Sequence, residues 1–275
     1  MSTNTMKWTQ RDVECAAKVL DSASAPGSAL PTLTDEEIVA LDGVQHEQIV
    51  ALPWLSAQNT EKEILCAVAL RGLLAKELVY PVIFEGETEP TRLHALEDIT
   101  GALTLRRSGD CVVSIERTVS TGRRWLYAYI HVEGVLLEEV DDGGLHGFSV
   151  ITPERLPARL ADFVDPDGAA ARDSEAVSYS EAGFEASAPT VLGDTRAASN
   201  VVAFTTASDA FPTITVYAGP SGVHVLTPRV PTPASGATAA PGTGETGASG
   251  AVSLEVREAS RETLEAALAG LVANP

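Results

Sequence analysis

An internal repeat is the feature that most constrains what this chain can fold into. Each copy consists of a strand, a Gly-Val pair that opens a second strand, a gap, a third strand, and a helix with apolar residues at every fourth position. In this order, the two copies comprise 125–132 and 213–217, Gly134-Val135 and Gly222-Val223, 148–151 and 252–256, and the helices that begin at Thr152 and Ser260. The repeat predicts a pseudo-two-fold domain whose halves share one sheet. Hairpin-and-helix units also recur by chance in α+β proteins, and this is the alternative explanation.

The apolar pattern changes after Leu78 from the helical period of about 3.6 residues to the strand period of about 2. Helices are predicted over 9–22, 34–42 and 60–77, and capping-box sequences at Thr34 and Thr60 mark two of their starts. Turn signals at short spacing then favour an antiparallel meander. The expected strands are 79–84, 103–105, 111–119, 125–132, 136–140, 148–151, 201–205, 213–217, 223–226 and 252–256.

These elements predict an α+β fold with a mainly antiparallel sheet, N-terminal helices and a C-terminal helix. With 275 residues, the chain is long enough for one large domain. We therefore predict a single α+β domain over 1–275, with approximate halves 60–164 and 198–275. Its predicted core contains Ile64, Val68, Leu105, Val113, Ile115, Tyr127, Ile130, Leu156, Leu160, Val216, Leu264 and Leu268.

Two stretches depart from this pattern. Residues 228–250 are of low complexity, since 20 of the 23 are Pro, Thr, Ala, Ser or Gly, and they predict a flexible insert. Residues 165–197 are acidic and rich in Ala and Ser, and they receive no assignment from the sequence.

The charge and targeting signals exclude several classes of function. Acidic residues outnumber basic ones by 38 to 19, and the formal net charge of −19 repels nucleic-acid backbones and anionic lipid head groups. No apolar run approaches the roughly 18 residues of a membrane helix, and residues 1–12 lack the apolar core of a secretory signal. The three cysteines are too far apart for a disulfide framework. We expect a cytoplasmic protein that binds no nucleic acid and inserts into no membrane.

Catalytic groups are sparse in this sequence. His131 and His224 lie in predicted strands, and four carboxylates cluster within 138–142. Sheet-face histidines and a solvated charged loop explain them better, because the five histidines never stand three or four apart and the carboxylates lack the spacing of a calcium loop. The glycine-rich segment 242–246 lacks the lysine of a phosphate-binding loop. We predict no catalytic, cofactor or metal site.

A winged-helix arrangement is a further interpretation of the N-terminal helices and the strands that follow them. The helix over 60–77 would then enter a groove of DNA, but Lys62, Arg71 and Lys76 are offset there by three glutamates. The helix therefore has no basic excess for that role.

Segments 69–74 (Ala-Leu-Arg-Gly-Leu-Leu) and 151–156 (Ile-Thr-Pro-Glu-Arg-Leu), with the strand meander between them, resemble the EspG-like proteins of actinobacterial type VII secretion. The C-terminal strands and leucine-spaced helix resemble them too, as does the arginine-rich, lysine-poor composition typical of GC-rich genomes. The resemblance covers about residues 60–275 and rests on the order and spacing of elements. The N-terminal helix and the acidic stretch do not match. This family implies a soluble cytosolic chaperone with a quasi-two-fold α+β fold that binds secretion substrates and has no catalytic residues.

The sequence thus predicts a non-catalytic cytosolic binding protein, a chaperone or adaptor for a secreted helical protein partner. It needs no cofactor, and the sequence does not identify the partner-binding residues. One alternative is an enzyme whose site assembles from His131, His224 and the 138–142 carboxylates. The other is a winged-helix-like regulator or scaffold built on the N-terminal helices.

Overall fold

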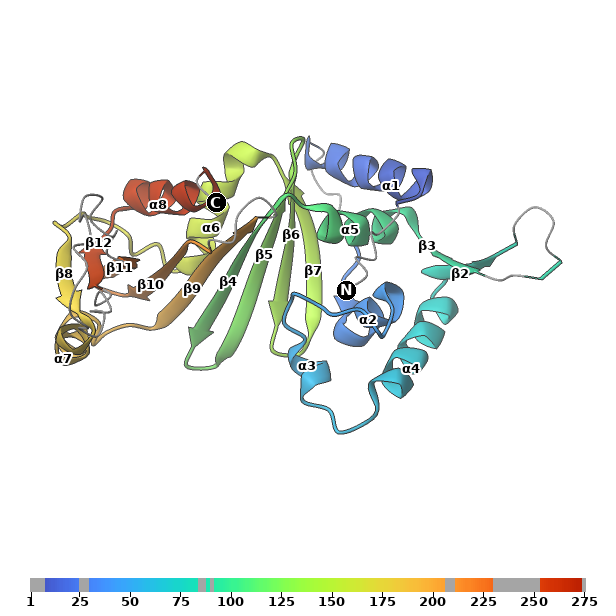
Figure 1. Ribbon diagram of the computed structural model, residues 1–275, viewed down its shortest axis with the longest axis horizontal. Coiled ribbons are helices and arrows are strands. Elements are labelled where there is room, and N and C mark those ends of the chain that lie inside the picture. Colours follow the sequence, from blue (N-terminus) through green and yellow to red (C-terminus); the bar gives the residue numbers. More distant parts are fainter. Residues whose placement is uncertain are drawn as a thin grey trace, which may run out of the picture.

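A ten-stranded sheet and a two-stranded ribbon form the β-structure in this computed structural model (Figure 1). The structure describes residues 8–24, 30–83, 88–89, 92–205, 211–229 and 253–273. The large sheet has the order β1-β7-β6-β5-β4-β9-β10-β11-β12-β8, and every neighbouring pair in it is antiparallel. The predicted α+β fold with an antiparallel sheet is confirmed.

The elements follow one another along the chain in a simple alternation. The strands are β1 (Leu33–Thr34), β2 (Val79–Val82), β3 (Arg92–Ala95), β4 (Cys111–Val119), β5 (Gly122–Ile130), β6 (Val135–Asp141), β7 (Leu145–Ile151), β8 (Val177–Ser180), β9 (Ala197–Thr205), β10 (Thr213–Gly219), β11 (Gly222–Arg229) and β12 (Ser253–Glu258). The helices are α1 (Gln10–Asp21), α2 (Asp35–Asp42), α3 (Pro53–Ser56), α4 (Lys62–Ala75), α5 (Glu97–Ser108), α6 (Leu156–Val164), α7 (Glu181–Val191) and α8 (Arg261–Ala273), with short 3-10 turns at Ser22–Ser24 and Pro153–Arg155. None of the described helices is both long and apolar enough to span a membrane.

The strand order reads the same from both ends of the sheet once β4–β7 are matched with β9–β12. β4 pairs with β9 at the centre, and the outer strands β1 and β8 pair with β7 and β12 respectively. The two helices of the repeat follow β7 and β12, as α6 and α8. The pseudo-two-fold repeat expected from the sequence is therefore present in the strand order.

The edge strands extend this repeat beyond the range in which the sequence made it visible. Leu33 of β1 pairs with His146, and Tyr179 of β8 pairs with Leu254. His146 and Leu254 stand 108 residues apart, the same offset that relates Thr152 to Ser260. Both edge strands lead directly into a helix, α2 or α7. The halves 60–164 and 198–275 stay a prediction, and β1 and β8 lie outside both ranges.

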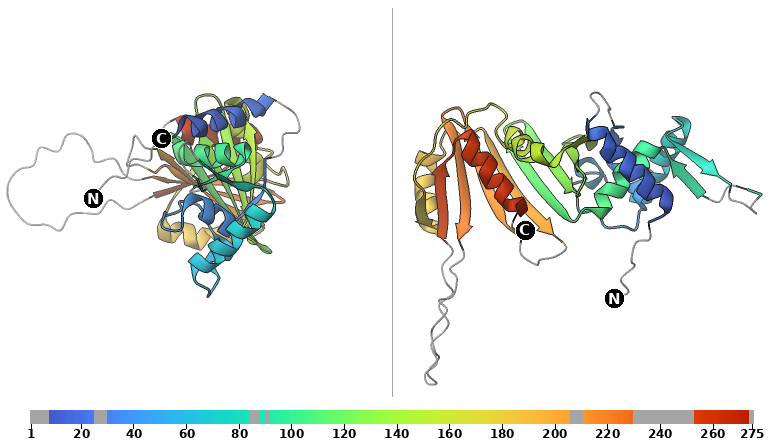
Figure 2. Two further views of the ribbon diagram at one scale, coloured as in Figure 1. Left: turned by 90° about the vertical axis from the view of Figure 1, so that its right-hand side faces the viewer. Right: turned by 90° about the horizontal axis from the view of Figure 1, so that it is seen from above.

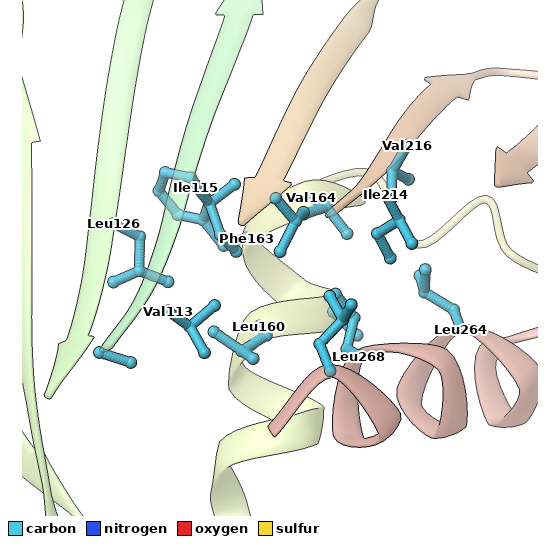
Figure 3. Packing of buried hydrophobic residues seen from close by; sticks show 14 of the residues in the cluster. Val113, Ile115, Leu126, Leu160, Phe163, Val164, Ile214, Val216, Leu264 and Leu268 are labelled. Atoms are coloured by element: carbon cyan, nitrogen blue, oxygen red, sulfur yellow. The ribbon is translucent and has the colours of Figure 1, made fainter. Parts of the chain in front are cut away.

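One face of the sheet is covered by α6 and α8, which pack against each other and against both halves (Figures 1 and 2). Leu160 and Leu268 point from these helices towards Val113, Ile115 and the second-half strands (Figure 3). The buried residues of the two halves form one continuous cluster on this face. A parallel sheet and two unconnected cores, which would contradict the predicted fold, are both absent from the described residues.

The opposite face of β4–β7 is covered by α1, α2 and α5 (Figure 1). Tyr127, Tyr129 and Leu136 project into this second cluster. A smaller cluster around Val39, Leu55 and Cys66 joins α2, α3 and α4. The β2–β3 ribbon projects from the end of the molecule beside α4 (Figures 1 and 2).

Two helix starts have complete capping boxes. Thr9 and Asp12 exchange hydrogen bonds at the start of α1, and Thr34 and Glu37 do so at the start of α2. The third box, predicted at Thr60, is wrong, because α4 begins at Lys62 without a side-chain cap.

Several other local predictions are wrong or need adjustment. Residues 103–105 lie in α5 and form no strand. The core positions Ile64 and Val68 are 52% and 63% exposed, because α4 buries its other face. The acidic stretch 165–197, which received no assignment from the sequence, contains β8 and α7. The insert predicted at 228–250 begins later, since residues 228 and 229 pair with β12; residues 230–250 lie outside the described residues.

Candidate protein-binding site

A groove of about 430 Å³ lies between α1, α5 and β3, and we call it the N-terminal groove. Trp8, Leu41, Leu93 and Leu103 supply its apolar lining. Leu93 is 44% exposed, although it is a large apolar side chain. An apolar lining within an open groove is typical of surfaces that bind another molecule.

The N-terminal groove is also locally cationic. Arg11, Arg92 and Arg107 line it, with Arg107 paired to the buried Asp42, and Asp12 is the one acidic side chain among its described lining residues. The Asp12 carboxylate accepts hydrogen bonds from the backbone and hydroxyl of Thr9, at 2.9 and 2.8 Å. On a chain of net charge −19, such a groove is a place where acidic groups are repelled less than elsewhere.

Hydrogen bonds hold the walls of the groove together. Arg11 Nη2 donates to the carbonyl oxygen of Ala95 at 3.0 Å and to the hydroxyl of Tyr80 at 3.2 Å, which ties α1 to the β2–β3 ribbon. Lys18 pairs with Glu97 across α1 and α5 at 2.7 Å. The cationic lining is therefore positioned by the fold.

Behind the groove, charged side chains with almost no solvent exposure form a buried network. Glu138 of β6 accepts hydrogen bonds from Arg106 Nε at 2.8 Å and from the Tyr129 hydroxyl at 2.6 Å. Its other oxygen lies 2.6 Å from His146 Nδ1, and His146 Nε2 lies 2.7 Å from Asp35. The side chains of Glu138, His146 and Asp35 are all 0% exposed. A cluster of this kind replaces water with protein partners on every side.

The network shifts the pKa values of its members in opposite directions. Burial alone would raise the pKa of Glu138, but the Arg106 charge and the His146 hydrogen bond lower it to about 2. Burial alone would lower the pKa of His146, but hydrogen bonds to Asp35 and Glu138 raise it. Burial and the Glu138 charge raise the pKa of Tyr129. Both charged forms, the carboxylate and the imidazolium, are thus stabilised by each other.

The expected solvated loop at 138–142 is therefore wrong for Glu138, which lies in a strand and is completely buried. Strand alternation gives the signal that sequence reasoning missed. Glu138 shares its sheet face with Leu136 and Val140, and both of these are buried apolar residues. A charged residue at an inward position of a strand indicates a buried partner.

The alternative catalytic constellation is not assembled in the structure. His131 follows β5 and lines a neighbouring apolar groove of about 330 Å³, whereas His224 lies on β11, and β4, β9 and β10 separate the two strands. Glu138 pairs with His146 and with neither of them. Burial lowers the pKa of His131. Among the described residues there is no group of three or more acidic, histidine or cysteine side chains that could hold a metal ion.

Further apolar side chains are exposed on the elements next to the groove. Tyr80 and Ile83 extend the exposed apolar surface along the ribbon, and Ile64 and Val68 form a stripe on α4. This stripe occupies the helix that a winged-helix protein would present to DNA. Its apolar character favours contact with a protein.

Among comparisons with known proteins, only the comparison with solved structures finds a similarity, and this similarity is in the fold. No family model matches the sequence, and no curated protein matches it. Twelve chains of solved structures match its fold. One is the structure of the Mycobacterium tuberculosis type VII secretion system chaperone EspG5 in complex with the PE25–PPE41 dimer, with a TM-score of 0.52, 10% sequence identity, and coverage of 88% of this chain and 95% of that chain. The chain therefore shares the fold of this secretion chaperone over nearly its whole length.

Proposed function

We propose that this protein is a non-catalytic chaperone or adaptor that binds a helical protein partner destined for secretion. The observation that carries the proposal is the shared fold with EspG5, a chaperone bound to a protein dimer, over 88% of the chain. The exposed apolar side chains beside the groove also support it, because such surface is typical of protein-binding sites. The cytoplasm is the compartment in which a chaperone would meet its partner before secretion.

The N-terminal groove is the proposed contact surface. Leu93 and Trp8 offer apolar contacts, and Arg11 attracts an acidic side chain. A helix with an apolar stripe bordered by Asp or Glu would satisfy both requirements. Such a partner would bury the exposed part of Leu93 and so remove apolar surface from water.

A binding experiment with two matched variants tests the proposal. The purified protein is titrated with helical dimers of the PE–PPE type from the same genome, and affinity is measured by calorimetry. Leu93→Asp places a charge in the groove. Leu145→Asp introduces the same charge outside the groove, at the start of β7, where Leu145 is 47% exposed and so resembles Leu93 at 44%. We expect Leu93→Asp to weaken binding at least tenfold, about 1.4 kcal/mol, and Leu145→Asp to leave it unchanged.

Two results would contradict the proposal. Equal loss of affinity in both variants would place the contact surface elsewhere. Turnover of a metabolite that co-purifies with the protein, abolished by His131→Ala or His224→Ala, would establish the enzyme alternative instead.

A further inference from the structure

Helix α2 is tied at both ends to one buried carboxylate on the sheet. Asp35, its first residue, contacts His146, and His146 contacts Glu138. Asp42, its last residue, accepts from Arg106 Nη1 at 3.1 Å, and Arg106 also donates to Glu138. The strands of the second half pair in the same order without these charged residues, so the strand order does not depend on this arrangement.

The second half repeats the strand order and the helix after the edge strand without these charges, and it has no described counterpart of α3, α4 or α5. The repeat matches Glu138 with Leu226 and His146 with Leu254, and it matches α2 with α7. Leu226 is buried, and Leu254 pairs with edge strand β8 as His146 pairs with β1. The charged network is therefore confined to the first half, and the repeated strand order forms without it in the second half.

The two ring nitrogens of His146 each face a carboxylate oxygen, at 2.6 and 2.7 Å. A neutral imidazole has one N–H, so it can donate to only one of these carboxylates. Its second nitrogen would then turn a lone pair towards a carboxylate lone pair. The geometry therefore fits the imidazolium, which donates to both.

With Asp35 ionised, the charges around His146 balance when His146 is an imidazolium. The groups that face the network come from α2 (Asp35, Asp42), β5 (Tyr129), β6 (Glu138), β7 (His146) and α5 (Arg106, Arg107), while α3 contributes the Leu55 amide that donates to Asp35 at 2.8 Å. Three carboxylates thus face two arginines and one histidine. Lys76 of α4 and Glu37 of α2 form a separate pair at 3.3 Å, so Lys76 does not supply a positive charge in place of His146. Loss of the His146 proton leaves one buried negative charge without compensation.

We infer that His146 is a pH-operated latch that clamps α2, and with it α3 and α4, to the sheet as the imidazolium and releases them when it loses its proton. The inference does not depend on the proposed function.

The direction of the pH effect follows from the hydrogen bonds. They hold the pKa of His146 above the ordinary value of 6.5 despite burial. The latch therefore stabilises the folded arrangement fully below pH 6.5, and this contribution is lost as the pH rises through the raised value. Glu138, with its pKa lowered to about 2, stays ionised throughout this window.

Opening of the latch would act on a defined unit. α4 packs mainly on α2 and shares the cluster of Val39, Leu55 and Cys66 with α2 and α3. α2 also supplies Leu41 to the N-terminal groove, and its Asp42 pairs with Arg107 in the groove lining. Release of α2 would therefore loosen α4 and one wall of the groove, while β9–β12 and α8 remain packed.

Hydrogen exchange of the free protein, measured by mass spectrometry from about pH 5 to about pH 9, tests the latch, because this range brackets the ordinary histidine pKa of about 6.5. After correction for the intrinsic exchange rate, protection in peptides from 35–75 should fall by up to about tenfold per pH unit between the ordinary and the raised pKa. Peptides from β9–β12 should show no such step. His146→Gln should remove the step, and His224→Gln, a histidine change in the second half, should keep it.

An imidazole nitrogen NMR titration of the wild-type protein decides the question even where His146→Gln does not fold. We expect a doubly protonated ring for His146 at pH 6.5 and a titration midpoint above that value. A neutral ring at pH 6.5, or a 35–75 segment whose corrected protection is the same across the pH range, would overturn the inference.

Discussion

Ile115 of β4 lies directly opposite Val201 of β9, and the pseudo-two-fold axis of the fold passes between them. The pairs on either side, Val113 with Ala203 and Arg117 with Ser199, are exchanged by this axis. Both Ile115 and Val201 are completely buried under α6 and α8. The two halves therefore meet at a fully packed strand pair, and a disturbance on one side of the axis is expected to reach the other.

Leu160 of α6 and Leu268 of α8 test this coupling, because they occupy equivalent places in one cluster (Figure 3). Both side chains are almost completely buried. Leu160→Ala and Leu268→Ala should each lower the free energy of unfolding by about 2–5 kcal/mol in urea denaturation. The double variant should deviate from additivity by at least about 0.5 kcal/mol, because the two cavities share neighbours. Strict additivity would point to two independent cores and contradict a single domain.

The order of elements was predictable from the sequence because the repeat keeps its spacing. The leucines of α6 and α8 stand at fixed intervals after Thr152 and Ser260, and the strands between them alternate. Nine of the twelve predicted core residues are accordingly buried, and Ile130 is partly buried at the margin of the cluster.

The errors arose where an element lacks a clear polar face. Leu103 and Leu105 alternate as in a strand, yet α5 is buried on nearly all sides, so helical periodicity is absent from its sequence. Ile64 and Val68 are as apolar as the buried Cys66 and Leu73 on the same helix. The local sequence pattern does not show which face of such a helix is buried, since that depends on its packing against the distant α2.

The candidate site could not be predicted from the local sequence pattern either, because it also depends on contacts between distant elements. Trp8, Leu93 and Arg107 come from three separate elements, and only the packing of α1 and the ribbon on α5 brings them together. Asp35 and His146 likewise meet across 111 residues of chain.

Gly101 allows α1 and α5 to cross closely. A Cβ atom there would lie 2.4 Å from the carbonyl oxygen of Cys15 and 2.6 Å from Val19 Cγ2. Gly101→Ala should therefore lower the free energy of unfolding by about 1–3 kcal/mol, because the helices must separate. Gly72→Ala in α4 is the matched control, since nothing lies within 4 Å of its Cβ position. That variant should raise stability by about 0.5–1 kcal/mol through helix propensity. A Gly101→Ala protein as stable as the wild type would show that α1 and α5 can separate at no cost in stability.

Gly144 has a positive φ of +71° and lies against the network. Its added Cβ would approach the Asp35 carboxylate to 2.7 Å and Trp54 Cβ to 2.8 Å. Gly168 has nearly the same conformation, φ +66°, with nothing within 4 Å. Thermal and urea unfolding should show a loss of about 1–2 kcal/mol for Gly168→Ala, from backbone strain alone. Gly144→Ala should lose more, because the clash adds to the strain. Equal losses would mean that Asp35 can move aside freely.

Glu138→Gln removes the central negative charge of the network but keeps its shape. In the wild type, the lowered pKa of Glu138, about 2 against an ordinary 4.5, stabilises the fold above pH 4.5, and this contribution is lost as the pH falls through about 2. The shift corresponds to about 3 kcal/mol. Glu138→Gln should therefore lower the free energy of unfolding by that order at pH 7 and show a flatter decline in acid. Glu116→Gln is the control, because its side chain is 43% exposed and its ion pair among the described residues is with the exposed Arg123. If both variants unfold alike from neutral pH to acid, the buried network makes no net electrostatic contribution to the fold.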